Sequence, residues 1–425
     1  MSHEDVPGIT PGTSANQPAV DEQAPSFSPK SRPASSSKRH KLKRRNYLAR
    51  AVLTLMLLAG FFFSVIPVGR AATRALFILP ALVFDSQPGV LTAAEEPVQH
   101  IRKTIQSNSG PVYLDIFEPV ASPPPIPGSR EGILFIPGVG DNRADPQFIN
   151  FSQSLARAGL VVMAVTTPTL INYDLSSNDS DGVVRAFQAL THWSGVGANR
   201  VGILGLSATG ALACFAAADP RIRDQVAFLG IFGSYFNART LLQAIGRRAL
   251  EVDGHLQPWQ PQYVPIQVLA NVIAPLLPPG EGDRLINALA PGGTPFTSSD
   301  LAELSPDTVA VYHLLNGDEP GQVDSNLASL SPPLQALLQD LSPSRVINSI
   351  RAPIYLLHDR NDQYVPFTES VEFDAALSRI HHPHDFAELG IFQHVEVRST
   401  INPWQLVGDG SSLLRLLTKT MLPGS

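Results

Sequence analysis

From about residue 111 onward, short runs of apolar residues alternate with stretches in which apolar and polar residues recur at helical spacing. Apolar runs of this length are typical of strands that are buried on both faces of a sheet. The predicted strands cover residues 111–119, 132–138, 160–168, 200–206, 225–233 and 352–359. The predicted helices between them cover residues 148–159, 181–193 and 208–218. Because helices separate the strands, we predict an α/β domain with a mainly parallel central sheet flanked by helices.

The alternation stops between residues 238 and 348. This region contains short apolar helical segments, LLQAIGRRAL and LQALLQDL, joined by Pro- and Gly-rich sequences such as LLPPGEG and APGGTP. A loop of that length without secondary structure is uncommon in a compact domain. We therefore predict a small helical insertion within an α/β domain that covers residues 111–425.

A different pattern occupies the N-terminal part of the chain. Residues 1–37 are polar and rich in Ser and Pro, and residues 38–45 (KRHKLKRR) form a dense basic block. The next apolar stretch, residues 51–69 (AVLTLMLLAGFFFSVIPVG), contains no charged residue. A helix of that length matches the hydrocarbon core of a bilayer, which is about 30 Å thick. We predict a disordered, basic cytoplasmic tail over residues 1–46 and a transmembrane helix over residues 47–69.

The basic block also predicts the orientation of the membrane helix, because Lys and Arg residues are retained on the cytoplasmic side. Everything after Arg70 is then extracytoplasmic. A cleaved signal peptide is the alternative interpretation of the apolar stretch. Within the connector at residues 70–110, the segment 74–84 (RALFILPALVF) is too short to span a bilayer and is expected at the membrane interface or docked on the domain. If this segment did cross, the domain would return to the cytoplasm.

Charge and cysteine content narrow the classes of function. The formal net charge is −6, but residues 1–50 hold nine Lys and Arg against four Asp and Glu, so the rest of the chain is clearly acidic. An acidic body argues against nucleic-acid binding. Cys214 is the single cysteine, which excludes an intrachain disulfide and a multi-cysteine metal site.

A candidate nucleophile, Ser207, follows the predicted strand at 200–206 and precedes a predicted helix, in the sequence GLSATG. A serine hydroxyl is a weak nucleophile, and a sharp turn presents it to a base. Gly205 fits such a turn, because small residues allow strand and helix to approach closely. Thr209 departs from the pattern G-x-S-x-G, with Gly210 one position late. The alternative interpretation of Ser207 is an N-cap of the helix.

A candidate acid and a candidate base follow later in the chain. Asp362, in HDRNDQYVPF, comes after the apolar strand at 352–359, at the sheet edge where α/β proteins bind ligands. Asp359 is a competing candidate that lies closer to the strand. His394 follows a short predicted strand, HDFAEL. The clustered histidines of the HHPH sequence at 381–384 are interpreted as solvated loop residues rather than metal ligands.

The ordered set Ser207, Asp362 and His394 resembles the α/β-hydrolase superfamily, whose chain order is nucleophile, acid, histidine. The resemblance covers residues 111–421, and the stretch LDIFEP…GILFIPGVGDN looks like the esterase and dienelactone-hydrolase-like branch. That branch has His-Gly where this chain has Pro137 and Gly138. The resemblance implies an α/β-hydrolase fold with the helical insertion as a cap over the active site.

The resemblance also implies an activity. The backbone N–H groups of Val139 and Ala208 would form the oxyanion hole. The protein is then expected to be a serine hydrolase that cleaves an ester or related acyl bond of a small-molecule substrate through an acyl-enzyme, with no metal or organic cofactor. An acyltransferase or thioesterase and a serine peptidase are alternatives on the same fold. A non-catalytic, membrane-tethered binding module is an alternative from a different class.

Overall fold

The computed structural model describes residues 52–56, 61–62, 66–83, 97–120, 128–393, 396–397 and 403–421. The chain divides into two compact units, residues 1–59 and residues 60–425. In the first unit only the helical residues 52–56 are described, and their side chains are exposed. All other described elements belong to the second unit.

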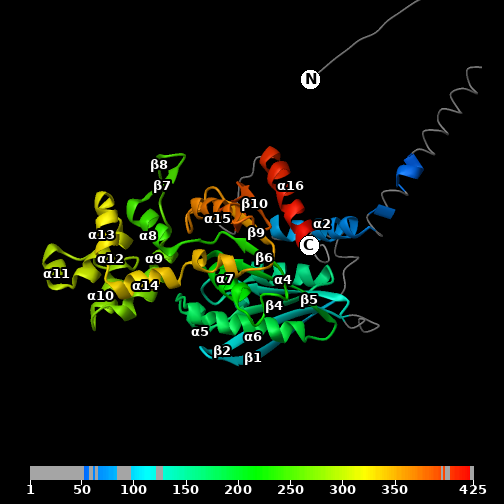
Figure 1. Ribbon diagram of the computed structural model, residues 1–425, viewed down its shortest axis with the longest axis horizontal. Coiled ribbons are helices and arrows are strands. Elements are labelled where there is room, and N and C mark those ends of the chain that lie inside the picture. Colours follow the sequence, from blue (N-terminus) through cyan, green and yellow to red (C-terminus); the bar gives the residue numbers. More distant parts are fainter. Residues whose placement is uncertain are drawn as a thin grey trace, which may run out of the picture. The chain divides into compact units, whose positions relative to one another are not determined.

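An eight-stranded sheet forms the centre of the second unit (Figure 1). Its strands are β1 (Val98–Ser107), β2 (Gly110–Pro119), β3 (Arg130–Ile136), β4 (Val161–Thr166), β5 (Val196–Leu206), β6 (Val226–Phe232), β9 (Ile354–Asp359) and β10 (His384–Leu389). They lie in the order β1-β2-β4-β3-β5-β6-β9-β10. The strand β2 is antiparallel to both of its neighbours, and the pairs from β4 to β10 are parallel. This order and these directions make the fold α/β-hydrolase-like. The six apolar strands predicted from the sequence and the short strand HDFAEL are confirmed.

Helices cover both faces of the sheet. On one face α4 (Pro146–Arg157) packs with α2 (Pro67–Val83) and α16 (Pro403–Thr420). On the other face lie α6 (Ser180–Thr191), α7 (Gly210–Ala218) and α15 (Phe367–Arg379). The helices predicted at 148–159, 181–193 and 208–218 correspond to α4, α6 and α7. Each face of the sheet therefore has its own hydrophobic core.

The strand β4 shows why the central strands could be recognised in the sequence. Val161, Met163 and Val165 belong to the core on the α6 and α7 face. Val162 and Ala164, which point the other way, belong to the core on the α4 face. Since successive side chains of a strand alternate between faces, a strand covered on both sides needs an uninterrupted apolar run.

The sheet begins upstream of the boundary predicted at residue 111. The strand β1 pairs with β2 along its whole length, from Val98 opposite Pro119 to Ser107 opposite Gly110. It is an edge strand, and most of its side chains are partly or fully exposed. Its sequence VQHIRKTIQS therefore lacks the apolar run that marks a buried strand, which is why the region was predicted as a connector.

The segment predicted as interfacial, residues 74–84, falls largely within α2. Ala71, Ala75 and Ile78 of this helix are buried, and α2 packs on α4 and α16. These side chains dock α2 on the domain, while a position at the membrane interface stays a prediction. Within the part of the chain that the structure describes, no helix is long and apolar enough to cross a membrane. The tail at 1–46 and most of the helix predicted at 47–69 lie outside the described residues.

Between β6 and β9 the chain forms a largely helical insertion, whose outer helices are yellow and yellow-green at the left of Figure 1. It consists mainly of α8 (Ala238–Arg247), α9 (Tyr263–Ile273), α10 (Glu281–Leu289), α11 (Ser298–Glu303), α12 (Pro306–Asn316), α13 (Val323–Ser329) and α14 (Pro332–Asp340). A small hairpin of β7 (Ala249–Val252) and β8 (His255–Pro258), which the sequence pattern did not indicate, precedes α9.

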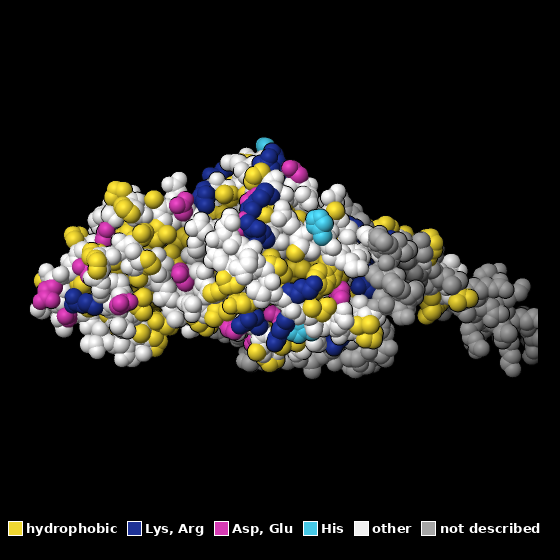
Figure 2. Space-filling view, turned by 90° about the horizontal axis from the view of Figure 1, so that it is seen from below, with side chains coloured by type: hydrophobic (Ala, Val, Ile, Leu, Met, Phe, Trp, Pro, Cys, Tyr) yellow, Lys and Arg dark blue, Asp and Glu magenta, His cyan; other side chains and the backbone are white. Residues whose placement is uncertain are grey.

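One face of the molecule can be followed in Figure 2, seen from below the view of Figure 1. Lys and Arg side chains are scattered over it among Asp and Glu side chains, and no basic stripe crosses this face. Arg185 and Arg221 both pair with Asp181, at 2.8 and 2.5 Å. Burial opposes ionisation of Asp181, but hydrogen bonds from Asn108, Arg185 and Arg221 outweigh it and lower the pKa of this carboxyl to about 2.

The chain enters and leaves the insertion at one point. The Ser344 N–H donates to Phe236 O at 3.1 Å, and the Ala238 N–H donates to Ser342 Oγ at 2.9 Å. The buried carboxylate of Glu369, on α15, accepts the Phe236 N–H at 2.9 Å. The junction is therefore held by hydrogen bonds between three separate parts of the sequence.

Glu369 makes the stability of this junction dependent on pH. Burial raises the pKa of its carboxyl from 4.5 to about 7, against the opposing effect of hydrogen bonds from Thr240, Asn237 and Phe236. The folded protein therefore binds this proton more tightly than the unfolded chain does. The resulting stabilisation is complete below about pH 4.5 and is lost as the pH rises through about 7.

We expect the free energy of unfolding of the wild type, relative to that of Glu369→Gln, to fall by about 3 kcal/mol between pH 4.5 and pH 8. Urea denaturation of both proteins across this range measures it. Glu303→Gln, at an exposed position of α11, should give a curve parallel to that of the wild type. Parallel curves for the wild type and Glu369→Gln would contradict the proposed titration.

Candidate active site

Ser207 occupies the sharp turn between β5 and α7. The strand ends at Leu206, and a 3₁₀ turn, Ser207–Thr209, leads directly into the helix. The φ angle of Ser207 is 54°, in the left-handed region that residues with a side chain rarely adopt. Strained backbone of this kind persists only where the surrounding structure enforces it, and it occurs frequently at functional sites. A serine raised on such a turn is the geometry of a nucleophile elbow.

Two glycines make this turn possible. A Cβ atom on Gly205 would lie 2.7 Å from Gly210 Cα and 2.9 Å from Ala213 Cβ. A Cβ atom on Gly210 would lie 2.5 Å from Ser234 Cβ. The strand, the turn and the start of α7 therefore approach too closely for any larger residue at either position. Gly210, one place later than in the usual pattern, is thus required by its contact with the chain after β6.

Thr209 has a structural role in place of the usual glycine. Its side chain is buried, and its hydroxyl is 2.8 Å from Ile136 O and 2.7 Å from Leu206 O, so that it donates between the two carbonyls. Ile136 is the last residue of β3, directly before the loop that begins at Pro137. The threonine therefore links the turn of Ser207 to the loop predicted to carry an oxyanion donor.

Replacing Thr209 with valine should remove this link while preserving the shape of the side chain. We expect the free energy of unfolding to fall by about 1–3 kcal/mol, because a buried carbonyl loses its donor. Chemical denaturation measures this loss. Thr209→Ser, which keeps the hydroxyl, is the matched control, and equal stability of the Val and Ser variants would refute the role of the hydrogen bond.

The loop after β3 passes beside Ser207. A Cβ atom on Gly138 would lie 3.8 Å from Ser207 Cβ, an ordinary contact distance. The Asn142 amide Nδ2 faces the carbonyl oxygens of Gly138, Val139 and Gly140 at 3.2, 3.3 and 3.4 Å. The Asn142 side chain therefore contacts three successive carbonyls, which lie on one side of the loop. Nothing in the sequence pattern indicated this residue.

The backbone N–H groups of this region differ in their partners. The Gly140 N–H donates to Leu170 O at 2.8 Å and is therefore engaged. Among the residues that the structure describes, neither the Val139 N–H nor the Ala208 N–H has an acceptor. Val139 and Ala208 both line the cavity onto which Ser207 opens. The two predicted oxyanion donors are thus beside the candidate nucleophile.

Asp362 lies just beyond the end of β9 and is buried. Its Oδ1 accepts the N–H groups of Tyr364 and Val365 at 2.7 and 2.9 Å. Its Oδ2 lies 3.4 Å from Nε2 of His358, which is also fully buried. These contacts hold one carboxylate oxygen against the turn of its own loop.

His358 is a buried residue of the site that the sequence analysis did not single out. Its Nε2 lies 3.0 Å from Val365 O, and since a carbonyl only accepts, this nitrogen carries the proton. Its Nδ1 lies 2.6 Å from Ser370 Oγ. With both ring nitrogens engaged inside the domain, His358 supports the Asp362 loop. The sequence HDRND, with a histidine inside a buried strand, was the available indication.

The competing acid, Asp359, is the last residue of β9 and is buried as well. Its Oδ1 accepts the N–H of Asn361 at 3.1 Å and the side-chain amide of Asn361 at 3.3 Å. Both carboxylates therefore lie at the carboxyl end of β9, and the structure brings both toward the edge of the sheet that carries Ser207.

The candidate base, His394, lies outside the described residues. The preceding segment is described as far as Gln393 and starts from the carboxyl end of β10, whose last residue Leu389 pairs with Asp359. After the strand, the carboxylate of Asp409 on α16 accepts the N–H groups of Gly390 and Ile391 at 2.7 and 3.0 Å. Asp409 was not identified in the sequence and anchors the segment that follows β10.

Two of the three histidines of the HHPH sequence, His382 and His384, are partly buried and have partners within the protein, so the prediction that they are solvated is wrong for these two. His382 Nε2 lies 2.8 Å from Ala352 O, and His384 Nε2 lies 3.2 Å from Asp374 Oδ1. Over the described ranges, no group of three or more His, Cys, Asp or Glu side chains is arranged to hold a metal ion.

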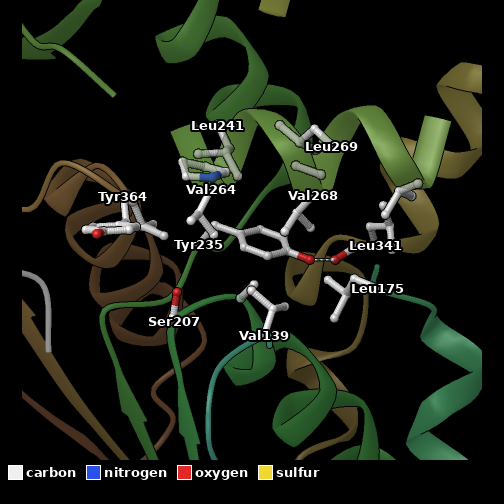
Figure 3. Close-up of a pocket in the computed structure, with 15 residues that line it drawn as sticks. Val139, Leu175, Ser207, Tyr235, Leu241, Val264, Val268, Leu269, Leu341 and Tyr364 are labelled. Atoms are coloured by element: carbon white, nitrogen blue, oxygen red, sulfur yellow. Dashed lines mark hydrogen bonds between the residues drawn. The ribbon is translucent and has the colours of Figure 1, made fainter. Parts of the chain in front are cut away.

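Ser207 opens onto a narrow cavity of about 40 Å³ (Figure 3). Its lining is apolar apart from Ser207 itself and the tyrosines Tyr235 and Tyr364. The Tyr235 hydroxyl donates to Leu341 O at 2.9 Å, and burial raises the pKa of this phenol. The tyrosine therefore presents its ring, rather than a free hydroxyl, to the cavity.

The insertion forms one side of this cavity. Most of its contribution comes from apolar residues of α8 and α9, namely Leu241, Val264, Val268, Leu269 and Val272. In Figure 3 the labelled members of this set lie across the cavity from Ser207 and Val139. The insertion thus covers the candidate nucleophile with an apolar surface.

Comparison with known proteins gives no family for this chain, since neither a protein-family model nor a curated protein matches it. A puromycin-hydrolyzing peptidase of Mycobacterium tuberculosis is a similar solved structure, with a TM-score of 0.47, 15% identity, and coverage of 79% of this chain and 41% of that chain. Pyrococcus horikoshii acylaminoacyl peptidase has a TM-score of 0.45 and 12% identity, over 78% and 42% of the two chains. Porphyromonas gingivalis dipeptidyl peptidase 4 has a TM-score of 0.43 and 14% identity, over 78% and 38%. The chain spans less than half the length of each of these proteins.

Proposed function

We propose that this protein is a serine hydrolase that cleaves an ester or a related acyl bond, with Ser207 as its nucleophile. The observation that carries the proposal is the strained turn of Ser207, which raises its hydroxyl toward an apolar cavity at the carboxyl edge of a parallel sheet. Ligands of open α/β sheets bind at this edge. A serine that served only as a helix N-cap would not need a left-handed backbone, because N-cap residues adopt extended angles.

In the proposed mechanism, His394 takes the proton of Ser207 as the hydroxyl attacks the acyl carbonyl. Asp362 orients the imidazole and stabilises its charged form. The N–H groups of Val139 and Ala208 hydrogen-bond to the oxyanion of the tetrahedral intermediate. The protonated His394 then returns its proton to the leaving group, and water releases the acyl group from Ser207 by the same steps.

The chemistry of the cavity supports an uncharged, apolar acyl group as the substrate portion bound next to Ser207. None of the side chains that line it is charged. A substrate with a free amino terminus at this position would leave its ammonium group without a counter-charge, at a large desolvation cost. An acyl ester or thioester with a small hydrocarbon group fits these walls without such a cost.

A fluorophosphonate probe tests the nucleophile directly. The full-length wild-type protein should be labelled, and Ser207→Ala should not be. Ser299→Ala, at an exposed position of α11, is the matched control and should be labelled like the wild type. A protein that is not labelled at all would be a binding module instead of an enzyme.

A panel of p-nitrophenyl esters of graded chain length, with thioester and peptide substrates beside them, then identifies the bond that is cleaved. We expect turnover of short-chain esters and loss of that turnover in Ser207→Ala. Cleavage of peptides in preference to all esters would point to a serine peptidase, and acyl transfer to an added alcohol in preference to water would point to an acyltransferase.

A further inference from the structure

We propose that α9 is a strap that connects the acyl cavity to two loops of the active site, with Trp259 and Asn271 as the positioning residues at its ends. The inference rests on the proposed function, since it assigns catalytic roles to those two loops. Its structural part, the attachment of α9 at both ends, can be tested without any activity.

The first attachment precedes α9. The indole of Trp259 is buried, and its Nε1–H donates to Asp362 O at 2.7 Å. The Trp259 N–H in turn donates to Arg248 O at 2.9 Å, which fixes the residue within the insertion. Three residues later, the Gln262 N–H donates to Gln363 O at 2.8 Å. The main chain of the loop that carries Asp362 is therefore held by hydrogen bonds from the residues that directly precede α9.

The second attachment lies near the other end of α9. The side-chain amide of Asn271 donates to the carbonyl oxygens of Asn172 and Tyr173 at 3.2 and 3.0 Å. Tyr173 has a left-handed φ of 55°. Its side chain packs closely on Gly140, where a Cβ atom would lie 3.1 Å from Tyr173 Oη.

This second attachment is connected to the loop after β3, which carries the proposed oxyanion donor Val139. The turn that Asn271 holds includes Leu170, whose carbonyl accepts the Gly140 N–H. Gly140 directly follows Val139, the proposed oxyanion donor. Asn271 is thus connected to the loop of Val139 through one turn of backbone. Trp259 is connected directly to the loop of Asp362.

Between its two attachments, α9 forms a wall of the cavity. Val264, Val268 and Val272 face the cavity along successive turns of the helix. The helix has 11 residues and is about 16 Å long at 1.5 Å per residue. An acyl group in the cavity therefore contacts the same rigid element that holds both loops. A displacement of about 1 Å in an active site can lower a rate about 100-fold, so loss of either attachment should affect turnover more than binding.

In the full-length protein, Trp259→Phe removes the indole hydrogen bond of the first attachment, and Asn271→Ala removes both side-chain hydrogen bonds of the second. With p-nitrophenyl butyrate as the probe, we expect each to lower kcat by about 10–100-fold and to change KM by less than about threefold. The exposed residues Trp404 and Asn287 provide matched controls. Trp404→Phe and Asn287→Ala should leave kcat unchanged.

Amide hydrogen exchange supplies a readout that does not depend on activity. Trp259→Phe should speed exchange of the Tyr364 and Val365 amides, which donate to Asp362, and leave the Gly140 amide unchanged. Asn271→Ala should speed exchange of the Gly140 amide and leave the Tyr364 and Val365 amides unchanged. Unchanged exchange at these amides, or a loss confined to KM, would overturn the role of α9. An inactive wild type in which the exchange pattern is as expected would instead refute only the proposed function.

Discussion

Ser207→Gly is expected to abolish hydrolysis and, at the same time, to make the protein more stable. Removing the nucleophile of a serine hydrolase lowers kcat by about 10⁶-fold. The left-handed φ of 54° at Ser207 costs a residue with a side chain about 1–2 kcal/mol, and glycine avoids this cost. The greater flexibility of glycine in the unfolded chain offsets about 0.5–1 kcal/mol of that gain. The net increase in the free energy of unfolding should be about 0.5–1 kcal/mol.

Ser207→Ala separates the two effects. Alanine also lacks the hydroxyl, so its kcat should be as low as that of the glycine variant. It keeps a Cβ atom and therefore the backbone strain, so its free energy of unfolding should stay close to that of the wild type. Urea denaturation of the three proteins measures the difference. A glycine variant less stable than the alanine variant would show that the turn stores no strain.

The parts of the fold that could be predicted are those in which burial determines the sequence. The strand β4 needs apolar residues on both faces, and its run Val161–Thr166 shows this directly. The strand β1 is covered on one side only and lies at the edge, so its side chains obey no such requirement. The position of β1 depends on pairing with β2, which local composition does not record.

The candidate site also contains residues whose positions could be predicted from the sequence and residues whose positions could not. Ser207 and Asp362 follow buried strands, so their places at the sheet edge could be predicted from the strand pattern. Trp259 contacts Asp362 across more than a hundred residues of sequence, and Glu369 reaches Phe236 over a similar separation. Such contacts depend on how the insertion packs on the domain. A single sequence holds no pattern that reveals them.

Thr209 shows the limit of judging a motif by its consensus. By pattern it is a departure from G-x-S-x-G. In the structure its hydroxyl links the ends of β3 and β5 through Ile136 and Leu206. The close approach that the motif normally requires at this position is met one residue later, at Gly210. The local geometry is thus retained with a different distribution of residues.

Asp362→Asn is expected to lower kcat by about 10⁴-fold while leaving KM nearly unchanged, because in the proposed mechanism it removes the negative charge that orients and stabilises His394. The asparagine carbonyl can still accept the N–H groups of Tyr364 and Val365, so the loop should keep its shape. Steady-state hydrolysis of p-nitrophenyl esters, with a melting curve for each variant, measures the effect.

Asp359→Asn is the matched test of the competing acid. Both carboxylates are buried at the end of β9, so burial alone does not distinguish them. Asp359 has its Oδ1 committed to Asn361 within a tight turn, whereas Asp362 lies on the loop that Trp259 holds. Asp359→Asn should therefore lower kcat less than about tenfold. A loss of activity larger for Asp359→Asn than for Asp362→Asn, at comparable stability, would assign the role of the acid to Asp359. The catalytic acid would then not be the residue whose main chain Trp259 holds.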